Sequence, residues 1–167
     1  MMKTQFKKRK PTRLKNFDYS NDGYYFITIC THNRKRIFSN IVGQGLAPAE
    51  NHLYQFGEIA DNELQDLTKR YKNVKIDKYV IMPNHIHAII ALENQTAGAS
   101  PCPTLSDVVC TFKSLTTRKC HLINPKQRIW QTSFHDHIIR DEEDYLKIWN
   151  YIDTNPLKWE EDCFYTE

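Results

Sequence analysis

His85 and His87 stand one residue apart in the apolar stretch YVIMPNHIHAII, from Tyr79 to Ile90. If this part of the chain is a β-strand, both imidazoles lie on one face of it, because side chains alternate between the two faces of a strand. Two imidazoles on one face can bind a single metal ion, although a hydrogen-bonded pair of core histidines fits the same pattern. A hard ion such as Mg²⁺ or Mn²⁺ also needs oxygen ligands, so the pair alone does not complete a site.

The segment NYIDTNP offers such an oxygen. Tyr151 and Asn155 are four residues apart, which places them one turn apart on the same face of a helix. Ile148 and Ile152 belong to the apolar stripe beside them, so we expect this face to lie toward a sheet. A phenol and an amide carbonyl would then reach the surface that carries the histidines. Taken singly, the two residues fit better as a core tyrosine and a helix C-cap before Pro156.

Strands and helices alternate along the chain, and no segment repeats another. Runs of β-branched and aromatic residues predict strands, and apolar residues at helical spacing predict helices. We expect strands over about 24–31, 74–82, 85–92 and 133–140, and helices over about 57–72, 104–122 and 141–156. The segment 39–53 contains two glycines and a proline and is expected to be a loop. This order indicates an α+β sandwich, in which helices pack on one mostly antiparallel sheet.

The length of 167 residues is enough for one hydrophobic core and too short for two comfortable domains. We expect a basic N-terminal arm over residues 1–16 and a single domain over residues 17–167. The arm contains seven of the 23 Lys and Arg residues and no acid, so the rest of the chain has more acids than bases. Such an arm can bind the phosphates of a polyanion, and a solvated tail is an equal alternative.

A second, weaker basic run lies between Thr104 and Trp130, where Asp107 is the only acid. Runs of this kind are usually solvated surfaces. Its cations are Lys113, Arg118, Lys119, Lys126 and Arg128.

No apolar run approaches the length of about 18 residues that a membrane span requires, and the basic start is not followed by the apolar segment of a signal peptide. The five cysteines have no regular spacing. We therefore expect a cytoplasmic protein with reduced thiols and no membrane partner.

Three stretches, MPNHIHAII, IWQTSFHDHIIRDEEDY and NYIDTNPLKW, closely resemble in order and spacing the REP-associated tyrosine transposases, a branch of the single-tyrosine HUH transposases. The opening RKPTRLKNFDYSNDGYYFITICTHNR is similar to the first strand of that family and its lead-in. The resemblance extends from about Arg9 to Trp159. It implies a ferredoxin-like fold and a metal-dependent endonuclease and strand transferase that acts on single-stranded DNA.

The resemblance also implies a role for each residue of the site. His85 and His87 would bind Mg²⁺ or Mn²⁺, Tyr151 would be the nucleophile, and Asn155 would complete the metal site. The product would be a 5′-phosphotyrosine and a free 3′-hydroxyl, so the 3′-hydroxyl of another strand could reverse the step without ATP. The DNA of this family is a single strand folded into a hairpin, and its members work as a monomer or as a homodimer.

Further residues are predicted to contact DNA. In the arm these are Arg9, Lys10, Arg13 and Lys15. Trp130 and Gln131 are expected to stack on a base or hydrogen-bond to it, and a core tryptophan is an equal alternative. His135 and His137 form another alternating pair, for which we expect a structural or DNA-contacting role rather than metal binding.

Two other classes of protein also have alternating histidines, the rolling-circle initiators and the histidine-triad hydrolases. Rolling-circle initiators often carry lysine three or four positions after their tyrosine, where this chain has Thr154 and Asn155. Histidine-triad hydrolases need a further histidine at the position of Ile89, so that class is excluded. Two alternatives stay open. One is a catalytically silent DNA-binding protein with the same fold, and the other is a nuclease that hydrolyses without strand transfer.

Overall fold

The computed structural model describes residues 17–42, 49–93 and 103–166. The predicted basic arm, with Arg9, Lys10, Arg13 and Lys15, lies outside the described residues. In the part of the chain that is described, no helix is long and apolar enough to cross a membrane.

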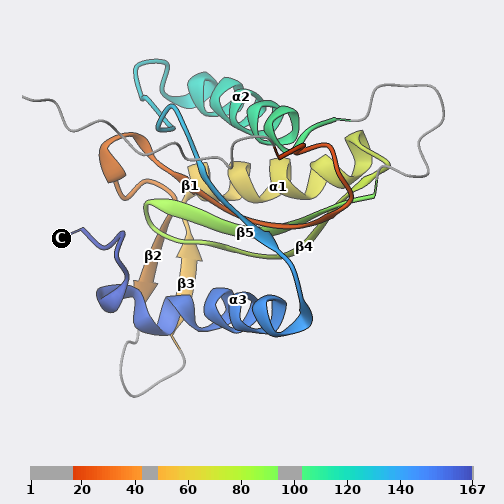
Figure 1. Cartoon of the computed structure of the whole chain (residues 1–167). Coiled ribbons are helices and arrows are strands. Elements are labelled where there is room, and N and C mark those ends of the chain that lie inside the picture. Colours follow the sequence, from red (N-terminus) through yellow and green to blue (C-terminus); the bar gives the residue numbers. More distant parts are fainter. Residues whose placement is uncertain (1–16, 43–48, 94–102, 167) are drawn as a thin grey trace, which may run out of the picture.

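Four strands form the central sheet in the order β4-β5-β1-β6, and every neighbouring pair is antiparallel. Their bounds are β1 Gly23–Cys30, β4 Val74–Ile81, β5 His85–Leu92 and β6 His135–Ile139. Helices α1 (Gln55–Arg70) and α2 (Leu105–Ile123) lie on one face of this sheet, and α3 (Glu142–Thr154) lies on the other (Figure 1). The order β1-α1-β4-β5-α2-β6 is the ferredoxin-like arrangement, so the predicted α+β sandwich is confirmed.

The strand β5 is buried along its whole length, because layers cover both of its faces. Ile86, Ala88 and Ile90 belong to the main hydrophobic cluster, together with buried residues of α1 and α2. The alternate residues His85 and His87 therefore point toward the α3 side. The strand thus separates a hydrophobic core on one side from polar groups on the other.

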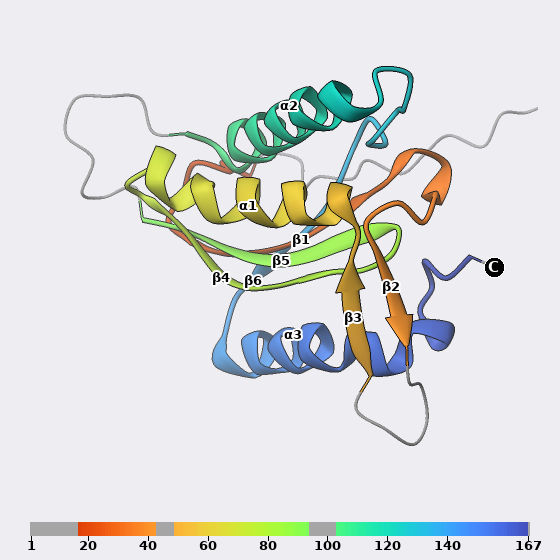
Figure 2. The ribbon, with the colours of Figure 1, turned by 180° about the vertical axis from the view of Figure 1, so that it is seen from behind.

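The prediction of a loop over residues 39–53 is wrong. The strands β2 (Ser39–Val42) and β3 (Glu50–Leu53) pair there as an antiparallel hairpin that extends beside α3 (Figure 2). Ile41 of β2 is buried in a second, small cluster with Met82 and Trp159, two residues that are remote in sequence. The glycines and Pro48 that suggested a loop fall in 43–48, outside the described residues.

The last predicted helix also ends differently. The α-helix stops at Thr154, and the chain continues directly as a 3₁₀-helix, Asn155–Glu161, with Pro156 in its first turn. Proline is tolerated there because the first turn of a helix needs no N–H donor. Asn155 is the C-cap of α3, as its place before Pro156 predicted, and it is buried with the helical angles φ −58° and ψ −41°.

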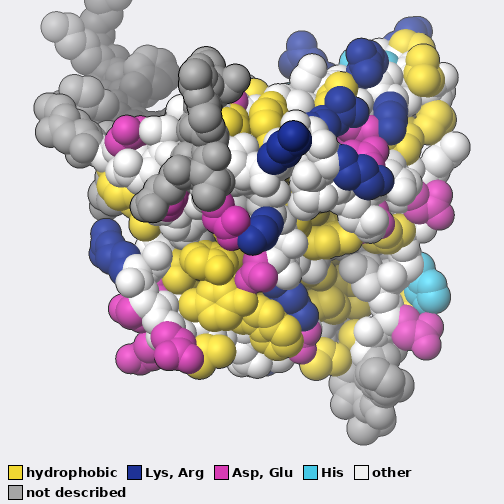
Figure 3. Space-filling model, turned by 90° about the vertical axis from the view of Figure 1, so that its right-hand side faces the viewer, with side chains coloured by type: hydrophobic (Ala, Val, Ile, Leu, Met, Phe, Trp, Pro, Cys, Tyr) yellow, Lys and Arg dark blue, Asp and Glu magenta, His cyan; other side chains and the backbone are white. Residues whose placement is uncertain are grey.

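The helix α3 is attached to the sheet mainly by polar contacts. Ile152 is the only residue of α3 that is buried, and Leu146 and Trp149 are exposed. Figure 3 shows the side of the molecule that is on the right in Figure 1. Hydrophobic side chains gather in its lower half, among charged ones. The ammonium of Lys78 on β4 pairs with Asp153 at 2.5 Å and lies 3.9 Å from the centre of the Trp149 ring. Contacts with β4 therefore fix where α3 lies on the sheet.

Candidate active site

Hydrogen bonds from a neighbouring asparagine orient His85. Asn84 Nδ2 donates to the carbonyl of Phe164 at 2.8 Å, so Asn84 Oδ1 faces His85 Nδ1, also at 2.8 Å. An acceptor at this position requires the proton to be on Nδ1, which leaves the lone pair of Nε2 directed into the site. This Nε2 atom is buried and has no hydrogen-bond partner within the described ranges.

His87 lies beside His85, and the centres of the two rings are 4.4 Å apart. Its Nδ1 is 2.9 Å from the hydroxyl oxygen of Thr28, the residue that pairs with it on β1. Its Nε2 lies 3.2 Å from the hydroxyl of Tyr151. The two imidazoles thus direct their Nε2 atoms to one place on the α3 side of the sheet.

Burial keeps both histidines neutral. It lowers the pKa of His85 to about 3, with help from the nearby Arg34 guanidinium. Burial and the neighbouring His85 lower the pKa of His87 well below its usual value. Neutral imidazole is the form that binds a metal ion, so the pair is ready for a cation at neutral pH.

The hydroxyl of Tyr151 lies at the edge of this cluster. The side chain is 39% exposed and borders an open pocket of about 420 Å³, to which Lys147 and Lys158 also contribute. The hydroxyl is 3.2 Å from a carboxylate oxygen of Asp162. Partial burial and the charge of Asp162 raise the pKa of Tyr151 well above its usual value, so the phenol keeps its proton in this state.

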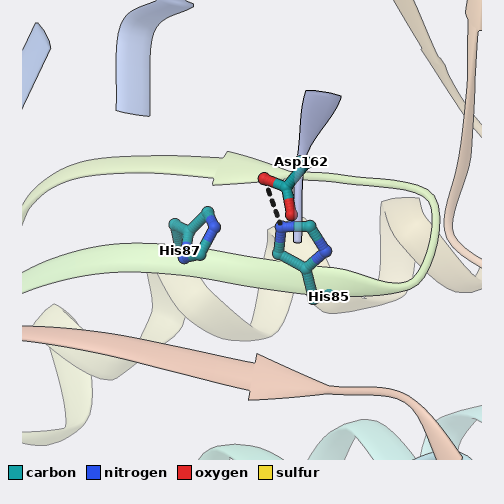
Figure 4. A group of neighbouring side chains, drawn as sticks. All are labelled: His85, His87 and Asp162. Carbon is teal, nitrogen blue, oxygen red and sulfur yellow. Dashed lines mark ion pairs between the residues drawn. The ribbon is translucent and has the colours of Figure 1, made fainter. Parts of the chain in front are cut away.

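Asp162 is a member of the site that the sequence analysis missed. One of its carboxylate oxygens accepts a hydrogen bond from Asn155 Nδ2 at 2.7 Å and lies 4.0 Å from His85 Nε2 (Figure 4). Ligand atoms of His85, His87 and Asp162 all lie within 4.8 Å of one another. In the sequence this residue is one of three consecutive acids and resembles an exposed turn. The 3₁₀-helix brings it back over the histidines.

These residues fit a divalent cation. Two neutral nitrogens and one carboxylate converge, and the donor set matches what a divalent metal binds. Asn155 Oδ1 is also buried, and no described residue hydrogen-bonds to it. A buried acceptor without a partner costs free energy that a bound cation would recover. The structure therefore brings His85, His87, Tyr151 and Asn155 together as predicted, and the part of Asn155 as a metal ligand stays a prediction.

The other predicted site residues lie outside this cluster. Thr28 pairs with His87 on one side and with His135 on the other, so His135 points to the same face but is two strands away from His87. His137 Nε2 is 2.7 Å from a carboxylate oxygen of Asp144 at the start of α3, which is a structural contact. Contact of either histidine with DNA remains a prediction.

Trp130 and Gln131 lie where the chain approaches β6. The indole of Trp130 packs against Phe38 and Phe112, with ring centres 5.0 and 5.4 Å apart, as a core tryptophan does. The backbone N–H of Gln131 donates to the carbonyl of Cys30 at 3.0 Å. Both residues border a surface groove, and their contact with a base is still a prediction.

Comparison with known proteins found relatives that cover different shares of the chain. No family model matches it. A Haemophilus influenzae protein described as uncharacterized is 33% identical over 174 residues, which cover 95% of this chain and 94% of that protein. An Escherichia coli protein named REP-associated tyrosine transposase is 32% identical over 90 residues, 54% of this chain and 48% of that protein. A second Haemophilus influenzae relative that bears this family name is 25% identical over 148 residues, 84% of this chain and 74% of its own length.

A solved structure has the same fold. It is described as the REP-associated tyrosine transposase bound to a REP hairpin, and it superposes with a TM-score of 0.63 at 20% identity. The superposition covers 90% of this chain and 74% of that one.

Proposed function

We propose that this chain is a member of the REP-associated tyrosine transposase family, and that it is a metal-dependent endonuclease and strand transferase that joins single-stranded DNA to Tyr151. The observation that best supports the proposal is the position of the Tyr151 hydroxyl. It lies 3.2 Å from His87 Nε2 and 3.2 Å from Asp162, next to the cluster that fits a cation, and it borders an open pocket. A nuclease that only hydrolyses would not need a tyrosine there.

In the proposed reaction the phenol oxygen of Tyr151 attacks the scissile phosphorus. The bond from this oxygen to phosphorus forms, the bond from phosphorus to the 3′-oxygen breaks, and the 3′-oxygen takes up a proton. The phenol proton passes to the carboxylate of Asp162, to which the Tyr151 hydroxyl donates at 3.2 Å, since His87 Nε2 would be a metal ligand. A metal ion held by His85, His87 and Asp162, with Asn155 as a further ligand, would polarise the scissile phosphate.

The proposed substrate is single-stranded DNA that contains a hairpin. The support comes from the relative whose structure is described as bound to a REP hairpin. Because the covalent product keeps the free energy of the phosphodiester, the 3′-hydroxyl of a second strand can displace the tyrosine without ATP. This reversal makes the activity a strand transfer.

The test is covalent capture of labelled hairpin DNA on a denaturing gel. We expect an adduct of protein and 5′-phosphate with Mn²⁺ or Mg²⁺ that disappears with a chelator and with Tyr151→Phe. Tyr54→Phe is the matched control, because Tyr54 is an exposed tyrosine at the start of α1. Cleavage that survives Tyr151→Phe without an adduct would support a hydrolytic nuclease instead. Binding without cleavage of any hairpin would support the catalytically silent alternative.

A further inference from the structure

A second groove lies at the end of the sheet where β1 stops. It has a volume of about 560 Å³ and is bordered by one face of α2 and by the segment that leads into β6. The polar residues that α2 contributes are Lys113, Ser114, Thr117 and His121. Arg128 and His32 border it from outside the helix.

The charge of this groove differs from that of the tyrosine pocket. Glu161 and Asp162 line the tyrosine pocket, whereas no acid lines the groove. Arg128 is exposed and forms no ion pair with any residue that the structure describes. A basic, acid-free groove in a domain that has more acids than bases favours a polyanion as its ligand.

Hydrogen bonds hold the groove in shape. The ammonium of Lys113 donates to the carbonyls of Gln131 at 2.6 Å and Thr132 at 3.0 Å. His121 Nε2 is 2.9 Å from the carbonyl of Gln127. These bonds attach the segment 127–132 to α2 and place a positive charge in the wall, so the groove does not have to form when a ligand arrives.

A backbone contact links one wall of the groove to the strand that carries His85. The backbone N–H of Gln131 donates to the carbonyl of Cys30, and Cys30 is the partner of His85 in the sheet register. From Gln131 the chain continues into β6, whose exposed first residue, His135, lies on the same face as His87. A strand that leaves the groove over this segment therefore reaches the face that carries the histidines.

We propose that this groove binds the phosphate backbone of the single strand that adjoins the cleaved phosphate. The inference rests on the proposed function, since it assigns a second binding site for the same DNA. Lysine, arginine and hydroxyl side chains contact phosphates without reading the base sequence. The groove would thus hold the strand in register with Tyr151 and leave recognition of the hairpin to other surfaces.

The experiment compares Arg128→Gln with Arg70→Gln, which removes the same charge from the exposed last turn of α1. Fluorescence anisotropy measures the binding of two DNAs at several salt concentrations, a hairpin with single-stranded extensions and the stem alone. For Arg128→Gln we expect the Kd of the extended DNA to rise about 5-fold, and the slope of log Kd against log salt to fall by about 0.7. Binding of the stem alone should not change, and Arg70→Gln should behave as the unaltered protein. Circular dichroism checks that both variants are folded.

The outcomes separate this inference from the proposed function. If Arg128→Gln binds the extended DNA with unaltered Kd and salt slope while the adduct with Tyr151 still forms, the groove is not the binding site and the proposed function stands. If the unaltered protein forms no adduct but Arg128→Gln still loses affinity for the extension, the groove binds single strands and the catalytic proposal fails. Equal loss of affinity for the stem alone would also overturn the inference, because the groove would then hold the duplex.

Discussion

At the scale of single residues, Asp162 links Tyr151 to the two buried histidines. Its carboxylate accepts hydrogen bonds from Asn155 and Tyr151 and lies 4.0 Å from His85 Nε2. No other carboxylate in the described part of the chain joins the histidine cluster. Its charge therefore acts on the affinity for a cation and on the acidity of the phenol.

We expect Asp162→Asn to weaken Mn²⁺ binding by at least about tenfold, because a charged oxygen ligand is lost. Without a metal, the pKa of Tyr151 should fall but stay raised, since burial, the larger cause, remains when the charge of Asp162 is removed. Calorimetric titration with Mn²⁺ measures the first effect, and ultraviolet titration of the phenol, compared with Tyr151→Phe, measures the second.

Glu161→Gln is the control for Asp162→Asn, because it removes a neighbouring charge that lies in the tyrosine pocket but outside the histidine cluster. Unaltered Mn²⁺ affinity in Asp162→Asn would remove this residue from the metal site.

Sequence reasoning could find four residues of the site because their spacing is local. The alternation of a strand orients His85 and His87, and one helical turn relates Tyr151 to Asn155. Asp162 could not be found in this way, because it reaches the site only through the 3₁₀-helix after Pro156. Neither periodicity nor spacing encodes where such a turn ends.

At the scale of elements, α3 carries Tyr151 while β5 carries the histidines. Contacts from β4 hold α3 in place. Lys78 contacts Asp153 and Trp149, and the Tyr145 hydroxyl donates to Asp77 at 2.5 Å. The contacts that hold Tyr151 in place therefore differ from those that orient the two histidines.

We expect Lys78→Met to lower the rate of adduct formation several-fold and to lower Mn²⁺ affinity less, because His85 and His87 lie on β5 and only Asn155 and Asp162 follow α3. The ion pair and the contact with the Trp149 ring are each worth about 1 kcal/mol or less, so the fold should survive their loss. Single-turnover kinetics on the denaturing gel, together with Mn²⁺ titration, measures the two quantities.

Lys75→Met is the matched control for Lys78→Met. It is the same substitution on the same strand, but Lys75 pairs with Glu93 rather than with α3. A parallel loss of Mn²⁺ affinity in Lys78→Met would show that β4 supports the histidines as well as the tyrosine.

The central sheet and its helices were predictable because periodicity is strong in these segments. The helix α2 even begins with the expected capping box of Thr104 and Asp107. The hairpin β2–β3 was missed because burial of Ile41 depends on Met82 and Trp159, two partners that no local pattern reveals. The prediction extended the signal of the glycines and the proline at 43–48 to the flanking segments 39–42 and 50–53, which form the strands.

At the scale of the whole molecule, the buried histidines couple stability to pH. The pKa of His85 is about 3 in the folded chain, and the ordinary pKa of about 6.5 applies to the unfolded chain. Between these values the unfolded state binds more protons, so the free energy of unfolding must fall as the pH drops below about 6.5.

We expect the metal-free protein to lose about 2 kcal/mol of stability per buried histidine between pH 7 and pH 5. Urea unfolding at a series of pH values measures the loss. His85→Gln should reduce the slope of the free energy of unfolding against pH. His52→Gln on β3 is the control, because the His52 side chain is 61% exposed. A slope that is the same in His85→Gln and in the unaltered protein would contradict the assignment.

The difference between the two faces of β5 also affects which mutations a descendant of this protein would tolerate. The face toward α1 and α2 holds the core, whereas the other face buries His85 Nε2 and Asn155 Oδ1 without hydrogen-bond partners among the described residues. Replacing such groups by apolar ones of similar shape removes a cost from the fold, so inactivating mutations at the site are tolerated or even favoured by stability. We therefore expect a descendant in which this site is no longer under selection to lose its histidines long before it loses its architecture. Such relics would persist as stable proteins.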